Sequence, residues 1–261
     1  MNSDLSSAAY FQQEGLDSLL GYMPSGGAEL PRDGITLDDK TPYPPDLDDL
    51  ARLHNLVRTR KVLTILEFGV GFSTMIMADA LAKNRQDHER ELNAMKIRCL
   101  HPFKIFSVDA DEDWILKTEK RIRHDLKEHV VLVKSDVYIG TFNDRLCHYY
   151  KNVPDVVPDF IYLDGPGGHQ VQGALDGSSF SDNLERTVVA ADVLRLEPTL
   201  VPGLMVVIDG RTNNARFLKN NLQRNWTIFE DAERDVSLLE LTETPLGIHN
   251  RTKLKFHGLL P

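Results

Sequence analysis

Four acidic residues each follow a short apolar run of the chain and could do chemistry together: Glu67, Asp109, Asp164 and Asp209. A carboxylate can accept hydrogen bonds from hydroxyl groups, attract a cationic group or remove a proton. The apolar runs are rich in β-branched and aromatic residues, which is typical of buried parallel strands. Because ligands bind outside the carboxyl ends of such strands, we expect these four residues at one ligand-binding edge.

The first apolar run leads into the glycine-rich turn Glu67-Phe-Gly69-Val-Gly71, which precedes a predicted helix. Glycines let the backbone approach a ligand closely, and a helix N-terminus offers unpaired N–H groups. The motif of a nicotinamide-dinucleotide site, Gly-x-Gly-x-x-Gly, needs a small residue at its third conserved position, where this chain has Thr74. The acidic residue expected about twenty residues further on is also missing from its usual place. Glu67 would repel a pyrophosphate and suits a ligand that carries an ammonium or sulfonium group.

This turn resembles the first motif of the class I S-adenosylmethionine (SAM)-dependent methyltransferases, in which an acidic residue precedes Gly-x-Gly at the end of the first strand. Many members have a third glycine where this chain has Ser73. The resemblance covers roughly residues 62–209. It implies that SAM is the cofactor and that Glu67, Gly69, Gly71 and Ser73 help to bind it.

The ends of the next two predicted strands would complete the cofactor site that the resemblance implies. Asp109 would bind both ribose hydroxyls, which are donors that match carboxylate oxygens. An alternative is that Asp109 caps the following helix, a place that Asp111 could also take. Ser135 and Asp136 follow the third strand and would lie at the adenine amino group.

The fourth and fifth predicted strands end where the resemblance places the methyl group and its acceptor. Asp164 precedes a glycine-rich loop and is expected both to contact the cofactor and to take part in catalysis. A hydroxyl acceptor must lose its proton, and Asp164 and His169 are the candidate bases. Arg211 could orient the acceptor or stabilise oxyanion charge. Asp209 is expected to project from the same edge and completes the set of candidate catalytic residues. The alternative for His169 is that it is a solvated surface residue.

A divalent cation, such as Mg²⁺, is a less favoured alternative. Asp164 and Asp209 would supply its oxygen ligands, and the metal would lower the pKa of the acceptor hydroxyl. Catechol-type and several sugar O-methyltransferases resemble this arrangement, but they usually carry another carboxylate or amide where this chain has Gly210. We therefore predict a site without a metal. A cap for the helix that begins near Asn213 is another interpretation of Asp209.

The expected acceptor is a small polar molecule with a hydroxyl group. The sequence Asp164-Gly-Pro resembles methyltransferases that act on sugar hydroxyls, so a sugar is the leading candidate. Two other functions remain open, an NAD(P)-dependent oxidoreductase and a non-catalytic methyltransferase-like domain that serves as a scaffold. Nothing in the pattern indicates an oligomeric state.

The order of the apolar runs predicts a three-layer, Rossmann-like α/β sandwich with a mostly parallel seven-stranded sheet and an antiparallel C-terminal edge. The runs that alternate with amphipathic segments are residues 62–66, 103–108, 130–133, 160–163 and 204–208. The predicted helices between and after them are residues 74–84, 114–128, 183–196 and 213–224. Three final runs are separated only by turns, at residues 226–229, 236–241 and 253–256.

The chain is expected to divide into an N-terminal extension, residues 1–60, and a methyltransferase domain, residues 61–261. Gly, Pro, Ser and Asp dominate up to about residue 46 and predict a flexible arm, in which the region around Tyr43 is a candidate acceptor contact. A helix is expected to start near Pro45 and to end at the basic residues 58–61. Residues 83–98 lengthen the first crossover as a helical insertion.

Composition argues against several classes of partner. The formal net charge of −9 disfavours sequence-independent binding to nucleic acid, which needs a basic surface. No apolar run is long enough to cross a membrane, and the N-terminus lacks the basic and hydrophobic regions of a secretory signal. The two cysteines, Cys99 and Cys147, lack metal-site spacing and are expected to be reduced thiols in a cytoplasmic protein.

Overall fold

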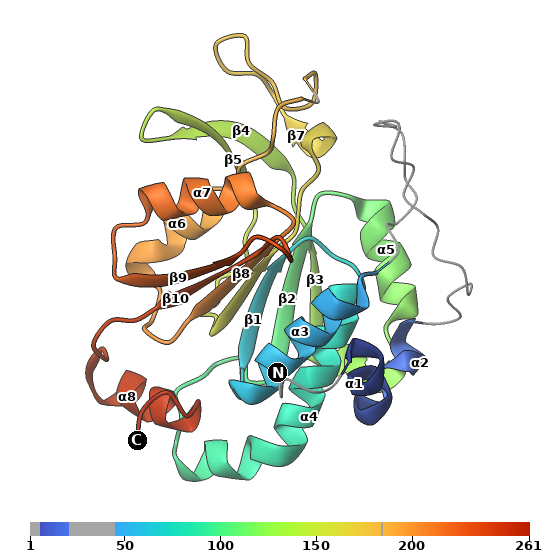
Figure 1. The fold of residues 1–261 in the computed structure, drawn as a ribbon, viewed down its shortest axis with the longest axis vertical. Helices are drawn as coiled ribbons and strands as arrows, with labels where there is room; N and C mark the ends of the chain where they lie inside the picture. The colour runs from blue at the N-terminus through green and yellow to red at the C-terminus, as the bar shows by residue number, and fades with distance from the viewer. Residues whose placement is uncertain (1–5, 21–44, 184) are drawn as a thin grey trace.

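The protein is built around a seven-stranded sheet with the strand order β3-β2-β1-β6-β8-β10-β9 (Figure 1). The structure, a computed structural model, describes residues 6–20, 45–183 and 185–261. The first five strands in this order pair in parallel, and β10 runs antiparallel to both β8 and β9. The strands are β1 (Thr64–Phe68), β2 (Lys104–Asp109), β3 (Val130–Lys134), β6 (Phe160–Leu163), β8 (Met205–Asp209), β9 (Trp226–Asp231) and β10 (Val236–Leu241).

The strand order reverses at β1. The chain runs outward from β1 to β2 and β3, and then crosses back to place β6 on the other side of β1. A crevice opens at such a reversal, outside the carboxyl ends of the strands, and this is where open α/β sheets bind ligands. The predicted mostly parallel, seven-stranded, Rossmann-like sheet is therefore confirmed.

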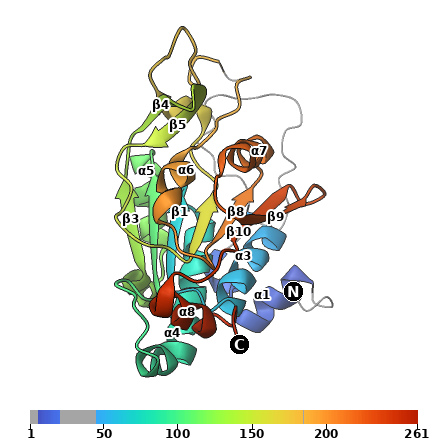
Figure 2. The ribbon, with the colours of Figure 1, turned by 90° about the vertical axis from the view of Figure 1, so that its left-hand side faces the viewer.

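Helices cover both faces of the sheet, which makes the expected three layers (Figures 1 and 2). One core cluster joins α1 (Ser7–Glu14), α3 (Leu47–Thr59) and α4 (Phe72–Ala94) to one face. The other cluster joins α6 (Asp192–Leu196) and α7 (Thr212–Asn221) to the opposite face. The remaining helices are α2 (Asp17–Leu20), α5 (Glu112–Arg121), α8 (Gly247–Phe256) and the 3-10 helices η1 (His124–His129), η2 (Gly168–Gln170) and η3 (Glu197–Thr199). Within the described ranges, no helix has the length and apolar character needed to cross a membrane.

Helix α3 forms as its sequence predicts. The carboxylate of Asp46 caps it by accepting a hydrogen bond from the N–H of Asp48 at 2.8 Å. Leu50, Leu53 and Val57 share its buried face, and the basic Arg58 lies in its last turn. Because α3 packs against α4, it brings residues of the predicted N-terminal extension against the helix that follows the glycine turn.

A second, small sheet was not predicted. It contains β4 (Val137–Phe142), β5 (Arg145–Tyr150) and the short β7 (Val171–Gln172), in the order β5-β4-β7. In both views it lies beyond the carboxyl ends of the parallel strands (Figures 1 and 2). It therefore adds a wall above the edge at which the predicted site residues gather.

The predicted strand at residues 253–256 is wrong, because these residues belong to α8. The alternating pattern of Lys253 to Phe256 is too short to distinguish a strand from a helix. In the structure Asn250 and Leu254, four residues apart, are both buried, which is the spacing of one helical face. Asn250 also accepts a hydrogen bond from the N–H of Leu246 at 2.9 Å and so holds the start of the helix.

The predicted helix at residues 183–196 is also mostly wrong. Only Asp192 to Leu196 are helical, and residue 184 lies outside the described residues. The backbone before this helix pairs with β5 instead, because the N–H of His148 donates to the carbonyl of Val189 at 2.8 Å. The N–H of Ala191 in turn donates to the carbonyl of His148 at 3.1 Å. Backbone groups that are used in this way cannot form helical hydrogen bonds.

Other helix boundaries differ from prediction in length. The insertion at residues 83–98 is helical to Ala94, as a direct continuation of α4. The predicted helix 114–128 breaks at Ile122 and continues as η1. Within the predicted flexible arm, residues 7–14 and 17–20 are helical, and Phe11 reaches the core. Tyr43 lies outside the described residues, so the prediction for it stays open.

At the amino ends of the strands, a buried ion pair joins the C-terminal helix to the sheet. Oδ2 of Asp159 accepts hydrogen bonds from the N–H groups of Leu63 and Thr64, each at 3.1 Å. The ammonium group of Lys253 on α8 contacts Oδ1 of Asp159. Burial by itself would raise the pKa of Asp159, but the charge of Lys253 holds that pKa well below its ordinary value.

We predict that Asp159→Asn destabilises the protein by about 3 kcal/mol, because it leaves the ammonium group of Lys253 buried without its counter-charge. The free energy of unfolding, measured by urea denaturation, checks this value.

Asp125→Asn is the matched control, since the ion pair between Asp125 and Arg123 lies at the surface. Such a pair contributes less than about 1 kcal/mol. Equal effects of the two substitutions would contradict a structural role for the buried pair.

Candidate functional site

Several of the predicted site residues lie at the carboxyl edge of the parallel sheet. Backbone hydrogen bonds connect the chain segments there: the N–H of Gly69 donates to Val108 at 2.8 Å, and the N–H of Asp164 donates to Phe68 at 2.9 Å. These bonds link the ends of β1, β2 and β6. The structure thus brings together segments that are far apart in the sequence.

The two glycines of the first turn have different surroundings. Gly69 has a φ of 105°, and a Cβ there would lie 3.0 Å from the backbone nitrogen of Gly165. A Cβ at Gly165 would in turn lie 2.8 Å from Cα of Gly69, so these two turns are in direct backbone contact. At Gly71 the nearest atom to an added Cβ is Nε1 of Trp114 at 4.0 Å. Gly69 is therefore required by packing, whereas Gly71 leaves one side of the turn open to a ligand.

Glu67 lies beneath the turn, fully buried. Oε1 accepts a hydrogen bond from the hydroxyl of Ser73 at 2.5 Å, and Oε2 accepts from the hydroxyls of Thr74 and Ser107 at 2.6 and 2.5 Å. Burial raises the pKa of Glu67 to about 7 in spite of these three donors. Glu67 and Ser73 thus connect the turn to the start of α4. If Glu67 contributes to ligand binding, it does so by holding the turn in place.

Asp109 faces the glycine turn from the end of β2. Its Oδ2 accepts a hydrogen bond from the N–H of Val70 at 2.9 Å, and burial raises the pKa of the carboxyl group. Asp111, and not Asp109, caps α5, because its side chain accepts a hydrogen bond from the N–H of Trp114 at 3.0 Å. The capping alternative for Asp109 is therefore wrong. Its Oδ1 accepts a hydrogen bond from the N–H of Asp111 at 2.8 Å, so each oxygen of this carboxylate has one backbone donor.

Ser135 and Asp136 follow β3 with different exposure. The buried hydroxyl of Ser135 accepts a hydrogen bond from the N–H of Asn152 at 2.9 Å and so supports the chain that leaves β5. The partly exposed carboxylate of Asp136 lies 2.9 Å from the ammonium group of Lys134, which holds the pKa of Asp136 below its ordinary value. Of the two, only Asp136 presents its side chain to solvent.

Arg211 holds the backbone of the loop that begins at Asp164. Its guanidinium donates to the carbonyl oxygens of Asp164 at 2.6 Å and of Pro166 at 3.0 Å. The carboxylate of Asp164 is 55 % exposed and lies 3.7 Å from Nε of Arg211. The surrounding protein atoms raise the pKa of Asp164, and the charge of Arg211 opposes that rise. Arg211 is thus committed to the loop, while the carboxylate of Asp164 stays open to a ligand.

Asp209 is more enclosed, with 11 % of its side chain exposed. The hydroxyl of Tyr162 donates to Oδ2 of Asp209 at 3.4 Å, and the guanidinium of Arg52 reaches the same oxygen at 3.4 Å. Burial and the negative charges of Asp49 and Asp164 raise the pKa of Asp209 to about 7. Asp49 and Arg52 could not be recognised as site residues from the sequence, because an acid and a base three residues apart on a helix form an ordinary surface pair.

His169 lies on η2 with an exposed side chain, and no hydrogen bond or ion pair joins it to another described residue. A Cβ added at Gly167 would lie 2.8 Å from Cε1 of His169, so the imidazole lies close to that glycine. The described contacts therefore do not bring His169 to Asp164 or Asp209.

The arrangement does not form a metal centre among the residues that the structure describes. No group of three or more His, Cys, Asp and Glu side chains in these ranges is placed to hold a metal ion. Oδ2 of Asp209 is bound by a cation and a phenol hydroxyl, which suits a carboxylate in an ion pair. The donor set expected for a divalent cation is thus not assembled here.

The unpredicted strand β5 places two more polar side chains near the site. His148 and Tyr150 are fully buried, and neither ring nitrogen of His148 nor the hydroxyl of Tyr150 has a hydrogen-bond partner among the described residues. The hydroxyl of Tyr150 lies 3.0 Å from the position of a Cβ at Gly165. Burial lowers the pKa of His148 to about 3, so its imidazole is neutral.

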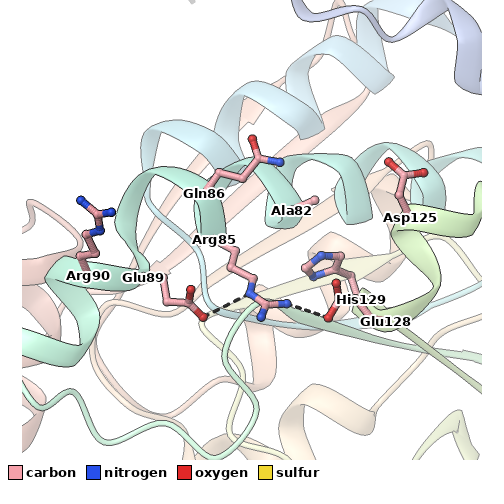
Figure 3. A pocket seen from close by; sticks show the side chains of 8 residues that line it. All are labelled: Ala82, Arg85, Gln86, Glu89, Arg90, Asp125, Glu128 and His129. Carbon is pink, nitrogen blue, oxygen red and sulfur yellow. Dashed lines mark hydrogen bonds and ion pairs between the residues drawn. The ribbon is translucent and has the colours of Figure 1, made fainter.

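An open pocket lies elsewhere, between the second half of α4 and η1, with a volume of ≈ 520 Å³ (Figure 3). Arg85 crosses it and binds both Glu89 and Glu128. The pocket starts at Ala82, ten residues into α4, so it lies about 15 Å along the helix from the glycine turn. It is therefore separate from the carboxyl edge of the sheet.

No protein-family model and no curated protein matches the chain. Among solved structures, the chain is similar to the O-methyltransferase TomG from Streptomyces achromogenes, which is involved in tomaymycin synthesis and was solved in complex with SAM. The two share 14 % identity with a TM-score of 0.43, and the match covers 77 % of this chain and 82 % of that one. A putative O-methyltransferase from Klebsiella pneumoniae has 14 % identity, coverage of 78 % and 84 %, and a TM-score of 0.43. An O-methyltransferase from Bacillus cereus, in complex with SAH, has 12 % identity, coverage of 91 % and 90 %, and a TM-score of 0.40. Likenesses this distant do not bear on function, which has to be argued from the site.

We predict that Gly69→Ala and Gly71→Ala affect stability differently. Alanine at position 69 must adopt a positive φ and push against the backbone of Gly165, so it should lower the free energy of unfolding by about 2 kcal/mol or more. Alanine at position 71 has open space and should change it by less than about 1 kcal/mol. Chemical denaturation of both variants measures the difference, and equal losses would show that the two turns do not pack as described.

Proposed function

We propose that the protein is a SAM-dependent methyltransferase that acts on a hydroxyl group of a small polar molecule. One observation carries the proposal: a glycine turn that is open at Gly71, the Asp109 carboxylate beside it, and the carboxylates of Asp164 and Asp209 share one edge of the sheet. This edge is where an α/β sheet of this strand order binds ligands.

The residues at the turn fit the parts of SAM. Gly71 lets the backbone approach closely, and the start of α4 offers N–H groups. The carboxylate of Asp109 is held toward the turn by the N–H of Val70 and suits a pair of ribose hydroxyls. Asp136 is accessible for an adenine amino group. Asp164 offers a solvent-accessible negative charge, which favours a cationic sulfonium over a pyrophosphate.

SAM would supply a methyl group on a positively charged sulfur, and the acceptor oxygen would take that methyl group while losing its proton. The chain must therefore hold the acceptor and accept a proton. We assign the proton to Asp209, because a base is most effective when its pKa lies near the working pH, and the pKa of Asp209 is about 7. Asp164 would line the same edge, and Arg211 would act by holding the loop at Asp164 and Pro166.

The acceptor class follows from charge and chemistry. The negative charges of Asp49 and Asp164 raise the pKa of Asp209, so the charge around the proposed base favours groups that donate hydrogen bonds over anions. A sugar or a related polyol offers several hydroxyl donors and stays our leading candidate. The net charge of −9 supports a small molecule over a nucleic acid.

We also propose that the protein works in a reducing compartment such as the cytoplasm. Cys99 and Cys147 are both free thiols, and Cys147 is fully buried in the core. Burial raises the pKa of each thiol, which disfavours the reactive thiolate.

Isothermal titration of the purified protein with SAM, and separately with NADH, tests the function. We expect a dissociation constant for SAM on the order of micromolar, and no binding of NADH. The SAM titration repeated with magnesium tests the metal alternative, which predicts tighter binding when magnesium is present. If the protein bound NADH and did not bind SAM, the assignment as a methyltransferase would be rejected in favour of an oxidoreductase. SAM binding without turnover across sugar and phenol acceptors would favour the scaffold.

We predict that turnover, once an acceptor is found in this screen, rises with pH through about 7, because Asp209 must lose its proton to act as a base. Asp209→Asn should lower kcat about a hundredfold or more. Asp164→Ala should lower kcat while SAM affinity stays within about an order of magnitude, unless Asp164 is mainly a cofactor contact.

A production assay for S-adenosylhomocysteine and a SAM titration of each variant separate these outcomes. A pH profile that is flat between about 6 and 8 would contradict the assignment of Asp209 as the base.

A further inference from the structure

Helix α3 of the N-terminal extension places a cation against Asp209. The guanidinium of Arg52 contacts the carboxylate of Asp49, one turn earlier on the helix, and lies 3.4 Å from Oδ2 of Asp209. The side chain of Arg52 is 14 % exposed, so this contact is more shielded from water than a surface ion pair. Arg52 therefore connects the N-terminal extension to the end of β8.

The same oxygen of Asp209 is held from the sheet. The hydroxyl of Tyr162, on the neighbouring strand β6, donates to Oδ2 at 3.4 Å. Oδ2 of Asp209 thus has two partners at 3.4 Å, and Oδ1 has no donor among the described residues.

Other charged groups near Asp209 do not replace Arg52. Arg211 directs its guanidinium to the carbonyl oxygens of Asp164 and Pro166, and Asp235 contacts the hydroxyl of Thr212. Asp49 and Asp164 are negative and raise the pKa of Asp209, whereas Arg52 lowers it. Of the described cations, Arg52 is the one that contacts the Asp209 carboxylate.

We propose that Arg52 is a positioning residue for the reaction, which holds Oδ2 of Asp209 so that Oδ1 faces the acceptor. This inference rests on the proposed methyl transfer, in which Asp209 accepts the acceptor's proton. As the acceptor oxygen bonds to the methyl carbon, the carbon–sulfur bond of bound SAM would break, and its electron pair would stay on the sulfur of S-adenosylhomocysteine. The proton of the acceptor hydroxyl would pass to Oδ1, and the Asp209 side chain would become a neutral acid. Arg52 touches neither reactant and acts only through the carboxylate.

Carboxyl ¹³C NMR of the full-length protein, with ¹³C at the aspartate side chains, tests the proposal without an acceptor. Asp209→Asn identifies the Asp209 signal by its loss. We expect Arg52→Met to raise the titration midpoint of Asp209 by about one pH unit, since a cation at this distance favours the charged carboxylate. Arg52→Lys keeps the charge and should restore most of the midpoint.

Arg58→Met is the matched control, because Arg58 lies on the same helix and pairs with Asn84 and Asp87 instead. It should leave the Asp209 midpoint unchanged, and thermal unfolding confirms that each variant folds. A midpoint that Arg52→Met does not move, or that Arg58→Met moves equally, would overturn the inference. The isothermal titration with SAM tests the methyl transfer separately. Failure of the wild-type protein to bind SAM in that titration would reject the methyl transfer itself.

Discussion

The enclosed carboxylate of Glu67 is the interaction on which the candidate site depends. It accepts hydroxyl hydrogen bonds from Ser73 and Thr74 at the start of α4 and from Ser107 on β2. Hydrogen bonds to a charged group contribute about 1.5–3 kcal/mol each, and burial opposes them by raising the pKa of Glu67 to about 7. The cluster connects the turn, the start of α4 and the second strand to one another.

That geometry permits the contact between Gly69 and Gly165, and this contact sets where the fourth strand can present its loop. Arg211 then holds the loop by two backbone carbonyls, which leaves the carboxylate of Asp164 accessible. Backbone contacts thus determine the shape of the site. The packing of Gly69 against Gly165 and the hydrogen bonds of Arg211 set the position from which Asp164 projects.

The two ends of the sheet use buried charge in opposite ways. At the amino end, Asp159 has two backbone donors and the ammonium group of Lys253, so its charged form is strongly favoured. At the carboxyl end, Asp209 has two long contacts and negative neighbours, and its pKa is raised to about 7. Fully paired charge is what a structural position needs, whereas a raised carboxyl pKa at the ligand-binding edge of a sheet is typical of proton transfer.

The sequence by itself determined the sheet, the glycine turn and the acidic residue that follows each parallel strand, because strand periodicity and turn chemistry are local properties. The sequence also indicated Asp111 as an alternative to Asp109 for the cap of the following helix, and the structure confirms that Asp111 is the cap. Only the tertiary structure decided that α3 brings Arg52 and Asp49 to Asp209, that β5 places Tyr150 under Gly165, and that residues 253–256 are helical. These features depend on contacts between segments distant along the chain, and no local pattern of residues encodes which segments will meet.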